Sequence, residues 1–245
     1  MMLFPVRVTI VAALAALLVC AGERAGAQAP GQSSSSQTPP AQTPAQAPEP
    51  QYVSIDPLAG VRYNNRYDLS LTMAYAHLKA GPNLLQGANL GGFNLEGSFW
   101  FSRHWAVEGT GREYVGTSGA APNPFQINGP FVAETLFAAG PEWLGPHNKH
   151  GALIAHVMAG GAYGRFQQDL RGNPTQAVGF YYDQVAPAVV MGGHLDLNRS
   201  PRWVFRVTVD GILTDYGINW GAKNRQLDIN TAVSVGLEYK FKRTR

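Results

Sequence analysis

The strongest constraint on the fold is a strict alternation of side-chain character along several stretches of the chain. In residues 91–101, every second position from Gly91 to Phe101 is hydrophobic or Gly, and the positions between them are mostly polar. Residues 203–214 and 231–241 repeat this pattern. A period of two indicates an extended strand with two unlike faces.

Eight segments of this kind follow one another: about 67–79, 88–101, 105–115, 129–143, 151–166, 181–197, 202–214 and 229–241. Strands of soluble proteins average roughly 5–6 residues, whereas membrane-spanning strands need about 9–11. Beyond residue 27, no apolar run approaches the length of about 18 residues that a spanning helix requires. The segments are therefore long enough to be transmembrane strands.

The connections between these segments alternate in length. The second, fourth and sixth segments are followed by short links, at 102–104, 144–150 and 198–201. The third, fifth and seventh are followed by longer ones, at 116–128, 167–180 and 215–228, and only the link at 80–87 is shorter than its counterparts. Short periplasmic turns and long extracellular loops are typical of outer-membrane barrels. The predicted fold is all-β, an eight-stranded antiparallel up-and-down transmembrane β-barrel.

The polar faces of these strands carry ionisable residues that we expect to point into the lumen. An unpaired buried charge costs several kcal/mol, so the core of a soluble sandwich would not accept them. The interior of an eight-stranded barrel is only wide enough for side chains to fill it. We therefore predict a paired network and a largely plugged lumen, with Arg206 between Asp196 and Glu238. The predicted lumen charge network consists of Glu96, Glu108, Arg112, Glu134, His156, Asp196, Arg206, Asp210, Glu238 and Lys240.

Aromatic residues gather beside the predicted short turns, as expected of a periplasmic membrane-interface girdle. These are Phe99, Phe101, Trp105, Trp143, Trp203 and Phe205. Tyr114 and the run at 180–182 are candidates for a second girdle at the outer rim.

The ends of the chain differ from its body. Residues 1–27 are typical of a cleaved signal peptide, and Val19 before Cys20 disfavours a lipoprotein anchor. Residues 28–50 form a Pro/Gln/Ser-rich linker that we expect to be disordered, and residues 51–245 form the barrel domain. Without residues 1–27, 17 Lys and Arg face 15 Asp and Glu, a weak balance that argues against a nucleic-acid partner.

Five segments carry motifs that resemble one family: TLFAAGP at 135–141, AHVMAGG at 155–161, GGHLDL at 192–197, FRVTVD at 205–210 and SVGLEYKF at 234–241. They resemble small OmpA-like outer-membrane β-barrel proteins of diderm bacteria, the outer membrane protein beta-barrel domain family. The resemblance implies that outer-membrane lipid and lipopolysaccharide surround the barrel. It also implies partners during biogenesis, namely the barrel-assembly machinery and periplasmic chaperones. Two departures are the tail Lys242–Arg245, which follows the aromatic Phe241, and the lack of a peptidoglycan-binding domain after the barrel.

Catalytic and metal chemistry have little support in the sequence. Ser234, His156 and Asp196 could be drawn as a triad, but no spacing predicts one, and a Gly-x-Ser-x-Gly elbow does not occur. His147 and His150 lack a third ligand at suitable spacing. We therefore expect no enzyme activity, no cofactor and no metal. The predicted function is a non-enzymatic outer-membrane barrel with an envelope-structural role, and the alternatives are a narrow porin for ions or small solutes and a surface-loop binding protein or adhesin.

Overall fold

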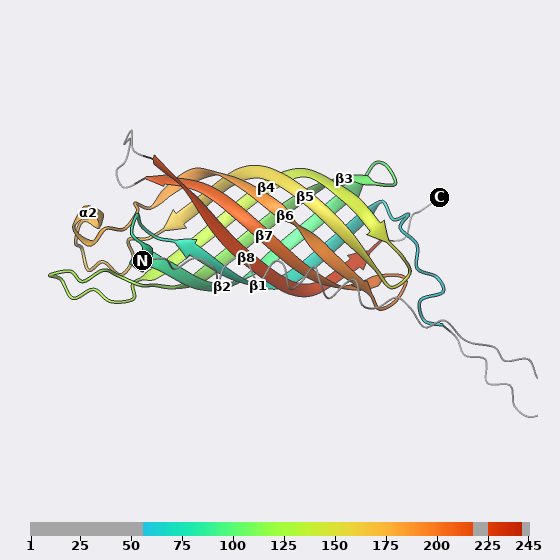
Figure 1. The fold of residues 1–245 in the computed structure, drawn as a ribbon, viewed down its shortest axis with the longest axis horizontal. Coiled ribbons are helices and arrows are strands. Elements are labelled where there is room, and N and C mark those ends of the chain that lie inside the picture. Colours follow the sequence, from blue (N-terminus) through green and yellow to red (C-terminus); the bar gives the residue numbers. More distant parts are fainter. Residues whose placement is uncertain (1–55, 218–224, 242–245) are drawn as a thin grey trace, which may run out of the picture. The chain divides into compact units, whose positions relative to one another are not determined.

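The computed structural model describes residues 56–217 and 225–241, and its strands close into one barrel (Figure 1). Each strand pairs antiparallel with the next, and β1 also pairs with β8. The predicted eight-stranded up-and-down barrel is thus confirmed. The strands are β1 (Tyr67–Lys79), β2 (Gly87–Trp100), β3 (Trp105–Ser118), β4 (Phe131–His147), β5 (Gly151–Arg165), β6 (Gln184–Asn198), β7 (Trp203–Gly217) and β8 (Arg225–Lys240). No helix in these described ranges is long and apolar enough to cross a membrane.

The two ends of the barrel differ in their connections, as the sequence predicts. At one end, which we call the short-turn end, β2–β3, β4–β5 and β6–β7 are joined by turns at 101–104, 148–150 and 199–202. The second turn is shorter than predicted because β4 continues to His147, with a register shift between Leu144 and His147. In each turn, the side chain of Ser102, Asn148 or Ser200 accepts a hydrogen bond from the backbone N–H three residues later.

The opposite end, the long-loop end, carries the connections at 80–86, 119–130 and 166–183. The first contains the 3₁₀ turn η1 (Leu84–Gln86), and the third contains the short helix α2 (Thr175–Val178), seen beyond the strand ends in Figure 1. The predicted loop at 215–228 lies partly outside the described residues, since β7 ends at Gly217 and β8 begins at Arg225.

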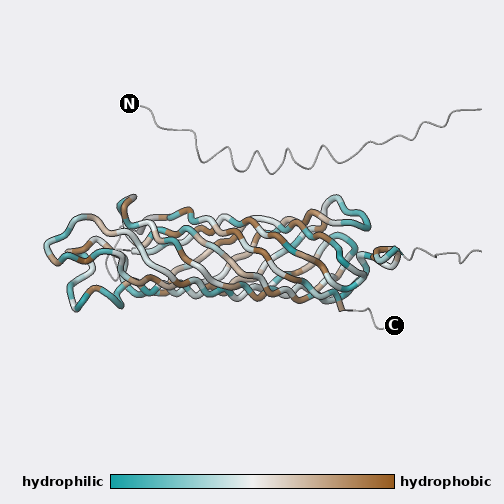
Figure 2. Tube along the Cα trace, turned by 90° about the horizontal axis from the view of Figure 1, so that it is seen from below, coloured by the Kyte–Doolittle hydropathy of each residue, from teal (hydrophilic) through white to brown (hydrophobic). Residues whose placement is uncertain are grey.

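Side-chain burial follows the two-residue period. In β1, exposed and buried residues alternate from Tyr67 to Leu78, and hydropathy alternates along the strands in Figure 2. The outward side chains are large and apolar, with Met73 77% and Phe137 68% exposed. The inward-facing side chains are instead a mixture of charged, polar, small and aliphatic residues, with Tyr114 and Tyr216 among them.

Four of the six aromatic residues predicted beside the short turns are exposed, whereas most of the predicted outer girdle is buried. Phe101, Trp105, Trp143 and Trp203 lie exposed near the short turns, whereas Phe99 and Phe205 are half-buried. The predicted outer girdle is wrong for Tyr114, Phe180 and Tyr181, which are all fully buried. Tyr114 has the lumen-facing parity of Arg112, and Phe180 and Tyr181 belong to the loop at 166–183, which folds inward. The exposed tyrosines towards the long-loop end are Tyr75 and Tyr163.

Candidate functional site: the lumen

Eight of the ten residues predicted for the lumen network form one continuous chain of ion pairs. Nitrogen–oxygen distances of 2.5–3.7 Å connect its members, and all of their side chains are buried. We call this set the ion-pair chain; its members are Glu96, Glu108, Arg112, His156, Asp196, Arg206, Asp210 and Glu238.

Arg206 is the hub nearest the short-turn end. Its Nε and Nη2 donate to Asp196 at 2.9 and 3.2 Å, and Nη2 also donates to Glu238 Oε2 at 2.7 Å. Asp196 and Arg206 are direct partners in the β6–β7 register. The predicted position of Arg206 between Asp196 and Glu238 is therefore confirmed. A guanidinium with several buried donors is suited to this role because it bonds two carboxylates in fixed geometry.

Arg112 is the second hub and crosses the lumen. It extends from β3, and its Nη1 lies 2.5 Å from Asp210 Oδ2 on β7, the strand opposite β3 in the ring of eight. Arg112 Nη2 also bonds Glu96 on β2 at 3.3 Å, and Glu96 lies 3.7 Å from Arg206. Glu96 thus joins the two hubs, and Arg112 links β3 to β7 across the lumen.

His156 continues the ion-pair chain on the other side of Asp210. Its Nε2 lies 2.9 Å from Asp210 Oδ1, and its Nδ1 lies 3.0 Å from Glu108 Oε2. His194, on the neighbouring strand β6, is also fully buried and approaches both His156 and Glu108.

Glu134 and Lys240, the other two predicted members, lie in the lumen apart from the ion-pair chain. Glu134 Oε2 accepts a hydrogen bond from Tyr216 at 2.8 Å towards the long-loop end. Lys240 Nζ donates to Asn198 at 3.3 Å and lies 4.3 Å from the ring centroid of Tyr63 at the short-turn end.

Among the described residues, four further buried acidic or histidine side chains lie outside the predicted network: Asp68, Glu142, His194 and Asp228. The parity of Glu142 and His194 matches that of Glu134 and Asp196 on the same strands, so that signal was present in the sequence. Asp228 lay outside the predicted eighth strand, because β8 begins four residues earlier than expected. Its carboxylate bonds Lys79 at 3.1 Å and Tyr181 at 2.6 Å.

Towards the long-loop end, the lumen is filled by an aromatic cluster, Phe166, Tyr181 and Tyr216. Their ring centroids lie 5.1–5.9 Å apart, and all three side chains are fully buried. Phe166 and Tyr181 come from the loop at 166–183, which Asp183 stabilises by accepting hydrogen bonds from the backbone N–H groups of Phe166 and Gln167. Burial and the hydrogen bond to Asp228 raise the pKa of Tyr181 above its ordinary value.

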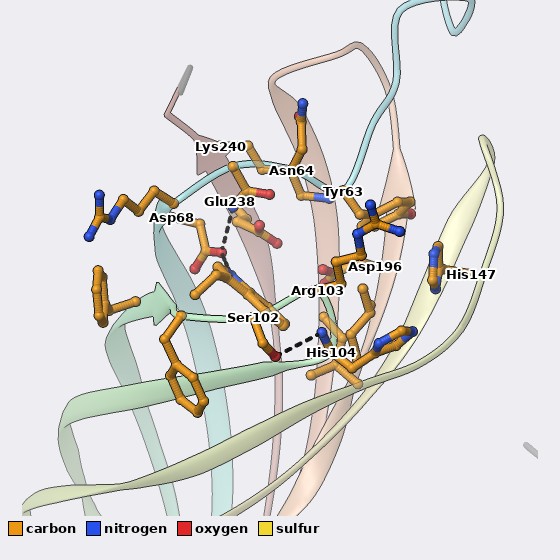
Figure 3. Close-up of a pocket in the computed structure, with 17 residues that line it drawn as sticks. Tyr63, Asn64, Asp68, Ser102, Arg103, His104, His147, Asp196, Glu238 and Lys240 are labelled. Atoms are coloured by element: carbon orange, nitrogen blue, oxygen red, sulfur yellow. Dashed lines mark hydrogen bonds between the residues drawn. The ribbon is translucent and has the colours of Figure 1, made fainter. Parts of the chain in front are cut away.

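At the short-turn end, a pocket of about 840 Å³ opens into the lumen (Figure 3). Its lining reaches Asp196, Glu238 and Ile154 in the barrel interior. Tyr63, at its mouth, donates to the carbonyl of Asn148 and accepts from Asn198 Nδ2 at 2.7 Å. Burial raises the pKa of Tyr63 to about 12, so this hydroxyl remains protonated at neutral pH.

The triad that could be drawn from the sequence is not assembled. Ser234 Oγ accepts a hydrogen bond from Thr72 at 3.1 Å, and His156 bonds Asp210 in place of Asp196. Nucleophilic catalysis requires the nucleophile and base to lie within hydrogen-bond distance. These three residues therefore do not form a charge-relay site.

No protein-family model and no curated protein sequence matches the chain. Solved structures do resemble it. The outer membrane protein OprG from Pseudomonas aeruginosa has 12% sequence identity and a TM-score of 0.52, covering 75% of this chain and 100% of its own. Neisserial surface protein A has 12% identity, a TM-score of 0.48, and coverage of 71% and 97%. Ail, the attachment invasion locus protein of Yersinia pestis, has 18% identity, a TM-score of 0.44, and coverage of 72% and 99%. The likeness to OprG shows that the chain has the fold of a small outer-membrane β-barrel.

Proposed function

We propose that this protein is an integral outer-membrane barrel that does not conduct, and that it serves as a structural element of the envelope. The observation that carries the proposal is the ion pair between Arg112 and Asp210, which joins opposite strands through the middle of the lumen.

The outer surface supports the membrane location. Large apolar side chains are exposed on every strand, among them Met73, Phe137, Val185 and Ile229. Soluble monomers rarely expose contiguous apolar patches of more than a few hundred Å². The exposed Trp105, Trp143 and Trp203 near the short turns fit a membrane interface on the periplasmic side. Outer-membrane lipid and lipopolysaccharide are the surroundings that such a surface fits, and we propose insertion by the barrel-assembly machinery after periplasmic chaperones deliver the chain.

The interior supports a closed state. An ion moving along the lumen would have to break Arg112–Asp210 and then pass the Phe166, Tyr181 and Tyr216 cluster. Breaking a buried ion pair leaves uncompensated charge in a medium of low dielectric, at a cost of about 3–5 kcal/mol. A pore would therefore require the ion-pair chain to rearrange.

Single-channel conductance of the full-length chain, purified from membranes and inserted in a planar bilayer, tests the proposal. A gel comparing heated and unheated samples confirms that the barrel is folded. We expect the folded wild type to be silent. The double variant Arg112→Ser with Asp210→Ser removes both partners of this ion pair and leaves the net charge of the lumen unchanged. We expect it to remove the central obstruction and to leave the aromatic cluster in place. Arg202→Ser, at the exposed short-turn end, is the matched control. Steady current from folded wild type would overturn the proposal and favour the narrow porin.

A further inference from the structure

We propose that Glu108, His156 and His194 form a binding site for one divalent transition-metal ion, of which Zn²⁺ is the best-matched, buried in the lumen. The three residues lie on β3, β5 and β6 and are all fully buried or nearly so. A bound ion would link three strands at the level of the ion-pair chain.

The ligand atoms already form a triangle of suitable size. His156 Nδ1 lies 2.9 Å from His194 Nε2 and 3.0 Å from Glu108 Oε2, and His194 Nε2 lies 3.3 Å from Glu108 Oε1. Zn–N and Zn–O bonds of about 2.0–2.2 Å in tetrahedral geometry place neighbouring ligand atoms about 3.3 Å apart. Expansion by a few tenths of an ångström therefore makes room for the ion.

The other nitrogen of each imidazole has its own partner. His156 Nε2 faces Asp210 Oδ1 at 2.9 Å, and Asp210 is held by Arg112 on its other oxygen. A carboxylate can only accept, so His156 Nε2 carries a proton that it donates to Asp210. His156 Nδ1 faces Glu108, and a metal ion would displace the proton between these two atoms, so that Nδ1 and the carboxylate both bind the ion. His194 Nδ1 lies 2.8 Å from the hydroxyl of Thr208, whose oxygen can accept a hydrogen bond from it. Such outer partners commonly orient metal-bound histidines.

The charge of the surroundings favours a cation. Among the described residues, nine carboxylates are buried, against the three cationic side chains of Arg112, Arg206 and Lys240. Within the described residues, the ion pairs of Glu108 are those with His156 and His194, and it has no arginine or lysine partner. Glu142 is the direct partner of His156 in the β4–β5 register, and neither of its buried oxygens makes a hydrogen bond within the described ranges. A divalent ion would compensate this local negative charge.

The donor set points to the metal class. Two imidazoles and one carboxylate are a combination found in zinc sites with a fourth position open to water, whereas Mg²⁺ and Ca²⁺ prefer oxygen ligands. Glu142, the register partner of His156, is a further oxygen donor on the adjacent strand. The short-turn-end pocket comes near this site, because its lining residue Ile154 pairs directly with His194 in the β5–β6 register.

Metal retention by the full-length, untagged chain in detergent tests this inference. After exposure to Zn²⁺ and desalting, we expect one equivalent of zinc by mass spectrometry, and a melting temperature that falls when EDTA removes it. Glu108→Gln and His194→Gln preserve side-chain size and should lose the retained zinc while remaining folded barrels. His147→Gln is the matched control, because His147 lies at the surface beside His104 and would account for adventitious binding.

Co²⁺ substitution gives a second readout that does not depend on the folding of the variants. The wild type should acquire the intense visible absorption of a low-symmetry four-coordinate Co²⁺ with histidine ligands, and excess Zn²⁺ should remove it. Folded wild type that retains no metal would overturn the proposal. Glu108→Gln that retains as much zinc as the wild type would also overturn it, as would loss of zinc in His147→Gln alone.

Discussion

The two halves of the lumen are filled by different kinds of side chain. Near the short-turn end and the middle, Arg206 and Arg112 hold carboxylates from several strands. Towards the long-loop end, inward-facing positions of the same strands include many Ala, Leu and Ile residues. Loop residues such as Phe166 and Leu170 fill the remaining space. The difference follows from the connections. Short turns have few side chains to contribute, so long arginines on the strands must cross the lumen, whereas long loops can fold apolar side chains inward.

The comparison also separates two kinds of stabilisation. An ion pair is directional and fixes which strands face each other, but each partner depends on the other to offset the loss of hydration. Apolar packing is non-directional. The free energy lost when an apolar side chain is truncated depends on how well the surrounding residues can close the cavity. A substitution in the ion-paired half should therefore destabilise the whole barrel. A substitution in the loop half should first increase unfolding in the loop itself.

The largest effect is expected from Arg206→Met. The variant leaves Asp196 and Glu238 buried without their cation, and we expect the free energy of unfolding to fall by about 3–5 kcal/mol. Urea unfolding in detergent, followed by tryptophan fluorescence, measures the change. Arg202→Met, at an exposed position, should have little effect, and an unchanged midpoint for Arg206→Met would show that the hub is not a stabilising element.

Phe166→Ala should have the next largest effect, about 3 kcal/mol, because it removes the edge-on contacts with Tyr181 and Tyr216. Because the cavity left by this substitution lies beside a surface loop, we expect hydrogen exchange to increase first in residues 166–183 and only later in the strands. Phe125→Ala, at a more exposed loop position, is the control. Uniform exchange throughout the barrel would contradict the division into two halves.

Tyr216→Phe tests a single polar contact inside the apolar half. Without the hydroxyl, the buried carboxylate of Glu134 loses the hydrogen bond it accepts at 2.8 Å, at a cost of about 1–3 kcal/mol. Tyr163→Phe, on the outer surface, provides the comparison in the same urea titration. If the free energy of unfolding fell as much as in Arg206→Met, the stability of both halves would depend equally on buried charge.

The smallest effect is expected for Asp56→Asn outside the barrel. Asp56 forms an exposed ion pair with Lys149 at 2.9 Å, and this hydrogen bond lowers the pKa of its carboxyl below the ordinary value. A lowered pKa means that any stabilisation is present above the ordinary pKa and is lost as the pH falls through the lowered one. Exposed pairs contribute little, so the urea midpoints of variant and wild type should coincide at pH 7 and at pH 3. A clear difference at pH 7 alone would show that this pair anchors the short-turn end.

The strand pattern made most of the architecture predictable. Alternation in residues 91–101 and 203–214 identified strands and the inward parity of Glu96, Arg206 and Asp210. The prediction is wrong where residue type and parity disagree: Tyr114 has the inward parity, although its residue type favours an outer girdle. Phe180 and Tyr181 lie in a loop, where no period indicates which way a side chain points.

The sequence by itself determined the number of strands, their inward and outward faces and the asymmetry of the two ends, because a two-residue period and connection length are local properties. The contact of Arg206 with its partners on the two adjacent strands could also be predicted, but contacts across the lumen depend on the three-dimensional fold. The approach of Arg112 to Asp210, 98 positions apart, and the convergence of Glu108, His156 and His194 depend on the strand register and on closure of the barrel. When the barrel closes, strands that are distant in sequence come close enough for their side chains to touch. A local sequence pattern carries no information about such contacts.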